Sequence, residues 1–199
     1  YLSNPEPLNR KVNSKFNESS AVFTKDGNTM YFTRNNYTDG KQRTDASKIT
    51  LLKLYKATKT DGDKLKNVQE LPFNSNEYSC AHPALSPDEK TLYFASNMPG
   101  SVGESDIFKV AINSDGSFGT PTSLEGGINT EARETFPFVT DDNLLFFASD
   151  GQSGLGGLDV FSVKIYENGT ISKVFNVGSP VNSAQDDFAY LIDSKTKSG

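Results

Sequence analysis

Hydrophobic and polar residues alternate in a pattern that recurs three times along the chain. Each copy has an apolar run, a short polar turn and a second apolar run, as in SSAVFTKDGNTMYFTRNN, AHPALSPDEKTLYFASNM and ETFPFVTDDNLLFFASDG. Short apolar runs on both sides of a polar turn are typical of β-hairpins. A third apolar run follows each copy and begins at Lys53, Asp106 or Asp159. The pattern predicts at least three strands per copy.

Further polar turns and an asparagine marker complete each repeat. Asp-Gly and Asn-Gly pairs, which tolerate positive φ, stand at expected reversals: Asp26-Gly27, Asp61-Gly62, Asp115-Gly116 and Asn168-Gly169. The markers recur at intervals of about 55 residues, at Asn13, Asn74, Asn129 and Asn182. We interpret these asparagines as Asx turns that lead into an innermost strand, and placement at a channel mouth is the alternative.

The second strand of each repeat determines the predicted fold. Its centre is a run of large apolar residues without alternation: Met30-Tyr31-Phe32, Leu92-Tyr93-Phe94 and Leu145-Phe146-Phe147. Such a strand must be covered on both faces, which a two-layer sandwich with wet outer faces does not provide. Four strands per unit in tandem predict an all-β protein, a β-propeller of four-stranded antiparallel blades.

The repeat also predicts how the chain is divided. Residues 1–12 are expected to hold the last strand of a preceding blade, and residues 182–199 the start of a following one. Three blades are expected between them, at 13–73, 74–128 and 129–181. We therefore expect a segment of a larger propeller. A ring built by two chains is the alternative.

Composition excludes several classes of function. The 199 residues carry a formal net charge of -5, with 35% hydrophobic residues. A nucleic-acid groove would need clustered Lys and Arg, which the chain lacks. No apolar run reaches the roughly 18 residues of a membrane helix, so any signal or anchor is expected outside this segment. With one cysteine and one histidine, a zinc site is not expected, and Cys80 is predicted to be a buried thiol.

Several motifs resemble a known family. TKDGNTMYFTRNN, LPFNSNEYSCAHPALSPDEKTLYFAS, ETFPFVTDDNLLFFASDGQSGLGGLDVF and VNSAQDDFAYLID resemble the WD40-like propeller repeats of the TolB type. The closer resemblance is to the propeller region of OmpA-family outer-membrane proteins of the Bacteroidota, one class of which belongs to type IX secretion. The chain departs from the family pattern at Glu89, which replaces a turn glycine, and at Lys53, which replaces an aspartate.

The resemblance implies a periplasmic, outer-membrane-associated scaffold with protein partners in the cell envelope. Peptidoglycan binding is implied only for a domain outside this chain. No cofactor and no nucleic-acid partner is expected. The location and the protein partners follow from the resemblance, and the absence of a nucleic-acid partner follows from the charge distribution described above.

The glycine-rich stretch from Ser149 to Phe161 does not fit a phosphate loop, since neither a helix nor Lys-Ser/Thr follows it. We expect its glycines to supply positive φ: Gly151, Gly154, Gly156 and Gly157. Asp106 and Asp159 are expected to accept hydrogen bonds from loop amides. The alternative is a calcium site in which Asp150 and Asp159 join backbone carbonyls.

Candidate catalytic groups are few. His82 has no G-x-S-x-G partner motif, and its counterparts in the other repeats are Ser20 and Phe136, so a structural or rim role is expected. The acidic pairs Asp141-Asp142 and Asp186-Asp187 are interpreted as turn residues and strand caps rather than a glycosidase pair.

The repeats differ most in a long insertion, residues 35–50, NNYTDGKQRTDASKIT. Loops on a rigid scaffold commonly carry function, so we expect a non-enzymatic module that binds protein partners. The interaction candidates are Asn35, Tyr37, Lys41, Arg43 and His82. A propeller that binds glycans in its central channel, or less favourably a propeller-type hydrolase, remains an alternative.

Overall fold

The structure is a computed structural model that describes residues 8, 12–13, 17–38, 41–59, 64–193, 195–196 and 198–199. Within these residues it contains β-strands and no helix. The strands form three four-stranded antiparallel sheets and one two-stranded sheet. This arrangement confirms the all-β prediction and the four-stranded blade.

Each four-stranded sheet corresponds to one sequence repeat. Blade 1 comprises β1 (Glu18–Phe23), β2 (Thr29–Asn35), β5 (Leu52–Lys59) and β6 (Leu65–Glu70). Blade 2 comprises β7 (Cys80–Leu85), β8 (Thr91–Ser96), β9 (Asp106–Ala111) and β10 (Thr122–Ser123). Blade 3 comprises β11 (Glu134–Val139), β12 (Leu144–Ser149), β13 (Asp159–Lys164) and β14 (Phe175–Asn176). The two-stranded sheet, β3 (Tyr37–Thr38) and β4 (Lys41–Gln42), lies within the insertion.

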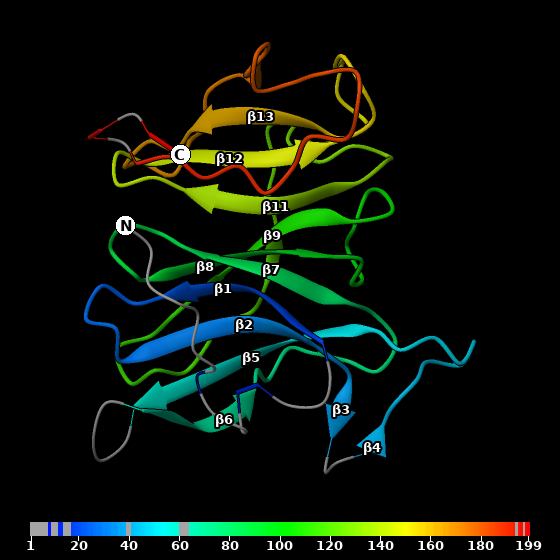
Figure 1. Ribbon diagram of the computed structural model, residues 1–199, viewed down its shortest axis with the longest axis vertical. Helices are drawn as coiled ribbons and strands as arrows, with labels where there is room; N and C mark the ends of the chain where they lie inside the picture. The colour runs from blue at the N-terminus through cyan, green and yellow to red at the C-terminus, as the bar shows by residue number, and fades with distance from the viewer. Residues whose placement is uncertain are drawn as a thin grey trace.

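The three blades lie one after another along the long axis of the molecule (Figure 1). Contacts join β1 to β7 and β7 to β11, so the first strand of each blade lies beside the first strand of the next. Strand order within each blade follows the chain outward from this inner strand. First strands that lie side by side, with sheets that extend outward from them, are the arrangement of a β-propeller.

The middle strands are buried on both faces, as the apolar runs predict. Phe32, Phe94 and Phe147 are each at most 1% exposed. The residues next to Phe32 and Phe94 point to the opposite face and are also buried, Tyr31 at 3% and Tyr93 at 6%. In blade 2 the two faces pack against different sheets, since Phe94 clusters with residues of blade 1 and Tyr93 with residues of blade 3. Burial of these side chains stabilises the stacking of the blades.

The tight turns follow the predicted chemistry. Gly27, Gly116 and Gly169 have φ of 66°, 78° and 81°, which residues other than glycine rarely adopt. Glu89 takes φ 59° where the family has glycine, and Asn143 takes φ 59° at the corresponding turn of blade 3. Asp61-Gly62 lies outside the described residues.

The marker asparagines have a different role from the predicted Asx turns. Asn74, Asn129 and Asn182 each bond both backbone groups of one residue on the third strand of the blade that they follow. Asn129 Oδ1 accepts the Ile107 amide at 2.7 Å, and its Nδ2 donates to the Ile107 carbonyl at 3.1 Å. Asn74 makes the same pair with Leu54, and Asn182 with Val160. The asparagine side chain thus bonds the third strand beyond the end of the fourth strand.

The last segment was expected to be a first strand, but the structure shows no strand between residues 177 and 193. A first strand needs the second strand of its own blade as a partner, and none pairs with it here. The segment nevertheless repeats the blade pattern, since the Asp187 amide bonds Leu158 O at 2.6 Å as the Glu134 amide bonds Ser105 O at 2.7 Å. In residues 1–12, expected to hold a strand of a preceding blade, only Leu8 and Val12 are described.

Candidate functional site

The loop between the second and third strands distinguishes the blades. In blade 2, Asp106 accepts hydrogen bonds from the amides of Val102 at 2.8 Å and Gly103 at 3.2 Å. In blade 3, Asp159 accepts the amides of Leu155 at 2.8 Å and Gly156 at 2.9 Å. Both aspartates are fully buried, so each closes a compact loop onto the blade as predicted.

The prediction of positive φ for the four glycines of the blade 3 loop is wrong, because none of them adopts it. These glycines are needed for another reason. A Cβ on Gly154 would lie 1.9 Å from Asp159 Oδ2, and one on Gly151 would lie 1.9 Å from Thr130 Oγ1. Gly156 and Gly157 would meet the backbone of Gln185 and the carboxylate of Asp186 in the same way. These positions require glycine because the loop lies directly against its neighbours.

Blade 1 lacks this aspartate and builds its interior differently. Lys53 occupies the position of Asp106, is 4% exposed, and places Nζ 2.6 Å from Glu70 Oε1. On the adjacent strand Arg34 Nε lies 2.9 Å from Glu18 Oε1, and its guanidinium lies 5.0 Å from the Tyr55 ring centroid. The aspartate and the compact loop are therefore absent together from this blade.

The insertion that replaces the compact loop is tied to the blade at its base. Asn36 donates through Nδ2 to Asn76 Oδ1 at 2.9 Å, and its amide bonds Leu51 O at 2.7 Å. Tyr55 Oη donates to Tyr37 O at 3.2 Å. Beyond these anchors β3 pairs with β4, and the following turn is closed by Asp45. The described residues of the insertion therefore form a two-stranded sheet and a turn with their own hydrogen bonds.

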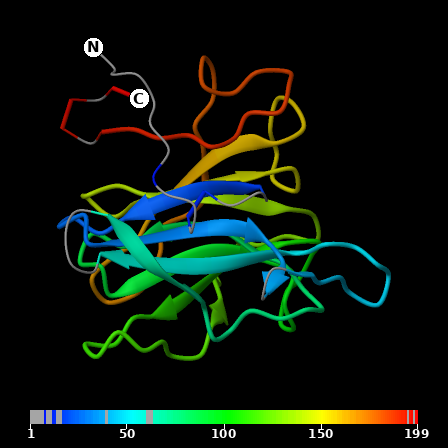
Figure 2. The same ribbon diagram turned by 60° about the horizontal axis from the view of Figure 1, so that its bottom comes forward.

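The tip of this hairpin is exposed and basic. Lys41, Arg43 and Lys48 are all exposed, and Asp45 is the one acidic residue between positions 41 and 50. These ten residues have a formal charge of +2, and the whole insertion, which also contains Asp39, has a formal charge of +1. Ile49 adds an apolar side chain that is 57% exposed. The segment extends away from the stacked blades in both views (Figure 1, Figure 2). This basic segment stands out on a chain whose formal net charge is -5.

Four of the five predicted interaction residues lie in this hairpin, and the fifth does not. Asn35 ends β2 and is half-buried, Tyr37 is in β3, and Lys41 and Arg43 are at or after β4. His82 lies on β7, in the middle of the stack of blades (Figure 1). The structure therefore separates His82 from the insertion.

His82 belongs to a repeated feature of the inner strands. Ser20, His82 and Phe136 have φ of 43°, 55° and 48°, and Ala189 has φ 57° at the corresponding point of the last segment. The register of β1, β7 and β11 shifts at the first three of these positions, which marks a β-bulge in each inner strand. Because the same bulge occurs at all three positions, Ser20, His82 and Phe136 are equivalent in the structure as well as in the sequence.

The His82 ring is held by neutral partners. Nδ1 lies 2.7 Å from Thr135 Oγ1, and the ring stacks on Phe136 with 3.8 Å between centroids. Burial lowers the pKa of His82 to about 4, so the imidazole is neutral at pH 7. Its amide donates to Thr33 Oγ1 at 2.9 Å, which links blades 1 and 2. This environment matches the expected structural role.

The inner strands line a shallow apolar groove of about 490 Å³. Its walls include the four left-handed residues described above, together with Phe138, Tyr190 and neighbouring prolines. Phe136 also stacks on Phe188, at 5.0 Å between centroids. The groove faces the side on which a propeller has its central axis.

The other acidic candidates have structural partners. Asp150 accepts Arg133 Nε at 2.8 Å and Nη2 at 2.6 Å, which lowers the pKa of Asp150. Asp142 accepts the Thr140 hydroxyl, Asp186 the Leu158 amide and Asp187 the Ser183 amide. In the part of the chain that the structure describes, no three His, Cys, Asp or Glu side chains form a group suited to a metal ion. Asp150 and Asp159, the calcium candidates, therefore bind different protein groups.

The hydrogen bonds of the asparagine markers and the bulges of the inner strands were missed by sequence reasoning. The regular spacing of the asparagines was visible, but their partners are 20 to 22 residues upstream, on another strand. The bulges left one signal, the unmatched series Ser20, His82 and Phe136 at one repeat position. A position that changes from polar to aromatic between repeats indicates a special backbone conformation rather than shared chemistry.

Comparisons with known proteins find likeness in structure alone. No family model matches the chain, and no curated protein matches it. Among solved structures, a puromycin-hydrolyzing peptidase of Mycobacterium tuberculosis is 17% identical with a TM-score of 0.53, over 85% of this chain and 24% of that one. A puromycin hydrolase is 16% identical with the same TM-score, over 79% and 23%. A TolB-type protein of Agrobacterium tumefaciens is 14% identical with a TM-score of 0.44, over 85% and 65%.

The likeness to the two puromycin-hydrolyzing proteins supports the propeller fold and nothing finer. The chain spans about a quarter of the length of these two proteins. At such low identity the activities of those proteins do not transfer to this chain. No helix among the described residues is both long and apolar enough to cross a membrane.

Proposed function

We propose that this chain is a non-enzymatic propeller scaffold that binds a protein partner through the basic hairpin, residues 35–50. The observation that supports the proposal is the replacement of the compact loop by a hairpin in one of the three blades. Blades 2 and 3 keep a compact, aspartate-closed loop, whereas blade 1 has Lys53 and an ordered, exposed hairpin in its place. A rigid sheet that presents one enlarged loop is a common design for binding.

The partner surface is acidic. Lys41, Arg43 and Lys48 provide the positive charge, and Ile49 provides an apolar contact beside them. Asn36 and Tyr37 hold the base of the hairpin, so the conformational entropy lost on binding is confined to the residues beyond that base. Attraction between opposite charges across the interface would accelerate association and weaken as salt is added.

The absence of enzymatic activity is part of this proposal. His82 is bonded to a threonine and stacked on a phenylalanine, and the acidic pairs cap turns and strands. The proposal also includes a periplasmic, outer-membrane-associated assembly, for which type IX secretion is one candidate. That location is supported by the family resemblance of the sequence motifs alone.

Site-specific photocrosslinking in the native host tests the proposal. A photoreactive phenylalanine at Arg43 is expected to capture a distinct protein, and capture should fall when Lys41 and Lys48 are both changed to Glu. The same group at Tyr166, which is 50% exposed on blade 3, is the matched control. Equal products from both positions, or no product from position 43, would contradict binding through the hairpin.

A further inference from the structure

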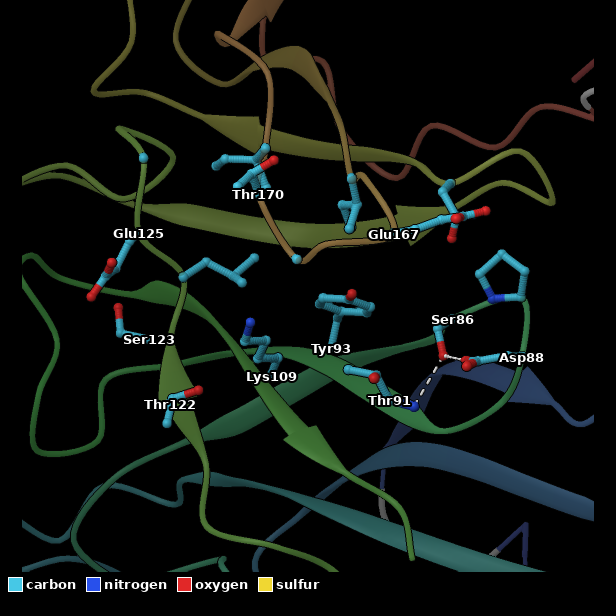
Figure 3. Close-up of a pocket in the computed structure, with 17 residues that line it drawn as sticks. Ser86, Asp88, Thr91, Tyr93, Lys109, Thr122, Ser123, Glu125, Glu167 and Thr170 are labelled. Atoms are coloured by element: carbon cyan, nitrogen blue, oxygen red, sulfur yellow. Dashed lines mark hydrogen bonds between the residues drawn. The ribbon is translucent and has the colours of Figure 1, made fainter.

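The clefts between neighbouring blades differ greatly in size. Near the hairpin turns of blades 2 and 3, a cleft of about 950 Å³ opens between them (Figure 3). The corresponding cleft between blades 1 and 2 has a volume of about 300 Å³. Binding sites for small molecules generally fall between roughly 300 and 1,000 Å³, so the larger cleft can hold a ligand of several rings.

The two clefts are built from equivalent positions. Tyr93 pairs with Lys109 across β8 and β9, as Tyr31 pairs with Lys56 across β2 and β5. Lys109 continues to Thr122 on β10, as Lys56 continues to Gln69 on β6. A row of tyrosine, lysine and a polar residue therefore runs along the wall of each cleft.

One side chain accounts for the difference in size. Phe118 of blade 2 reaches over the smaller cleft and packs edge-on against Tyr31 at 6.3 Å and against Phe73 at 5.6 Å between ring centroids. The equivalent residue of blade 3 is Ile171, because the bridge between Ile165 and Ile171 matches that between Ile112 and Phe118. Ile171 packs against the cluster that contains Tyr93, and the larger cleft stays open beside these two residues.

The larger cleft contains hydrogen-bonding groups that have no protein partner. Within the described residues, no hydrogen bond or ion pair involves the Tyr93 hydroxyl, the Lys109 ammonium, or the carboxylates of Glu125 and Glu167. Tyr93 is nonetheless only 6% exposed, and burial raises its pKa to about 12, so the phenol is protonated and can donate. Asp88 differs from these groups because it already accepts the Ser86 hydroxyl at 2.6 Å.

The charges of the cleft limit what it can bind. Lys109 and the exposed carboxylates of Glu125 and Glu167 line the same cleft, so the cleft presents groups of both charges. A neutral ligand with many hydroxyl groups satisfies both kinds of group, since each hydroxyl can donate and accept. Leu124, Ile165 and Ile171 add apolar surface for the carbon-bound hydrogens of such a ligand.

We infer that the cleft between blades 2 and 3 binds a neutral oligosaccharide. Tyr93 and Lys109 donate to its hydroxyl oxygens, and Glu125 and Glu167 accept from its hydroxyl groups. This site is distinct from the basic hairpin and from the inner-strand groove. Its occupancy does not depend on the proposed protein partner.

Calorimetric titration with maltotriose, cellotriose and triacetylchitotriose tests this inference. At least one of these neutral trisaccharides is expected to bind saturably, with trilysine and triglutamate binding more weakly than it. Tyr93→Phe removes one hydrogen bond and should weaken binding by about 2- to 12-fold. Tyr31→Phe, at the equivalent position of the covered cleft, should leave affinity unchanged.

Ile171→Phe copies the closed cleft and should abolish binding, with its unfolding midpoint measured to show that the blades remain folded. If that variant unfolds, the comparison of Tyr93→Phe with Tyr31→Phe decides the question. Three results would overturn the inference: no trisaccharide binds, a charged peptide binds more tightly than all of them, or Tyr93→Phe binds as tightly as the unaltered protein.

Discussion

The asparagine between blades 2 and 3 offers a quantitative test of how the blades are held together. In Asn129→Ala, the Ile107 amide loses its partner, whereas the Ile107 carbonyl keeps the Leu124 amide at 2.9 Å. Ile107 is fully buried, and a buried backbone group left unpaired costs about 1–3 kcal/mol. We therefore expect a loss of about 1–3 kcal/mol in the free energy of unfolding.

Urea titration followed by circular dichroism measures this loss. For a chain of this size, the melting temperature in a thermal unfolding experiment should fall by roughly 2–12 °C. Asn113→Ala is the matched control, because Asn113 is exposed and its Nδ2 reaches only the Ser117 hydroxyl in its own turn. The control should change stability by less than about 0.5 kcal/mol. If Asn129→Ala is no more destabilising than Asn113→Ala, the marker asparagine does not hold the third strand.

Three further outcomes follow from buried groups. Lys53→Asp introduces the residue that blades 2 and 3 have at this position. The new carboxylate would face Glu70 without a compact loop to bond it, so the free energy of unfolding in a urea titration should fall by about 2–4 kcal/mol. Unchanged stability would refute the coupling of Lys53 to the insertion. His82 has a folded pKa of about 4, below its unfolded value of 6.5, so its contribution to stability is present above pH 6.5 and lost as the pH falls toward 4. His82→Gln should therefore show a smaller drop in urea midpoint over that window than the unaltered protein. Cys80 is fully buried with a thiol pKa of about 12, so it should react with a thiol reagent at pH 8 only as fast as the protein unfolds, and rapid labelling would contradict its burial.

The fold could be predicted from the sequence because the blade pattern occurs three times. Runs such as Leu92-Tyr93-Phe94 need cover on two faces, and that need is local enough to be visible in a single strand. The turns at Gly27, Gly116 and Gly169 were visible for the same reason, since φ there is set by neighbouring residues. Asp106 and Asp159 were correctly placed because their partners lie three or four residues away.

Features that depend on distant neighbours could not be predicted. Gly154 and Gly151 cannot carry a side chain because Asp159 and Thr130 lie against them, and only the folded blade shows these contacts. His82 shares a candidate set with Lys41 and Arg43 in sequence, but it lies on an inner strand rather than in the hairpin. The open cleft depends on one exchange, Phe118 in blade 2 for Ile171 in blade 3, whose effect appears only when two blades are side by side.

Hydrogen exchange followed by mass spectrometry tests the account of a rigid propeller with one presented hairpin most directly. Amides of β2, β8 and β12 should exchange slowest and to a similar degree, because each lies between two strands and under two packed faces. Residues 41–50 should exchange quickly, and crosslinking of the partner at position 43 should slow them. Fast exchange throughout any of the three middle strands, or an exchange rate at 41–50 that the bound partner leaves unchanged, would contradict the account.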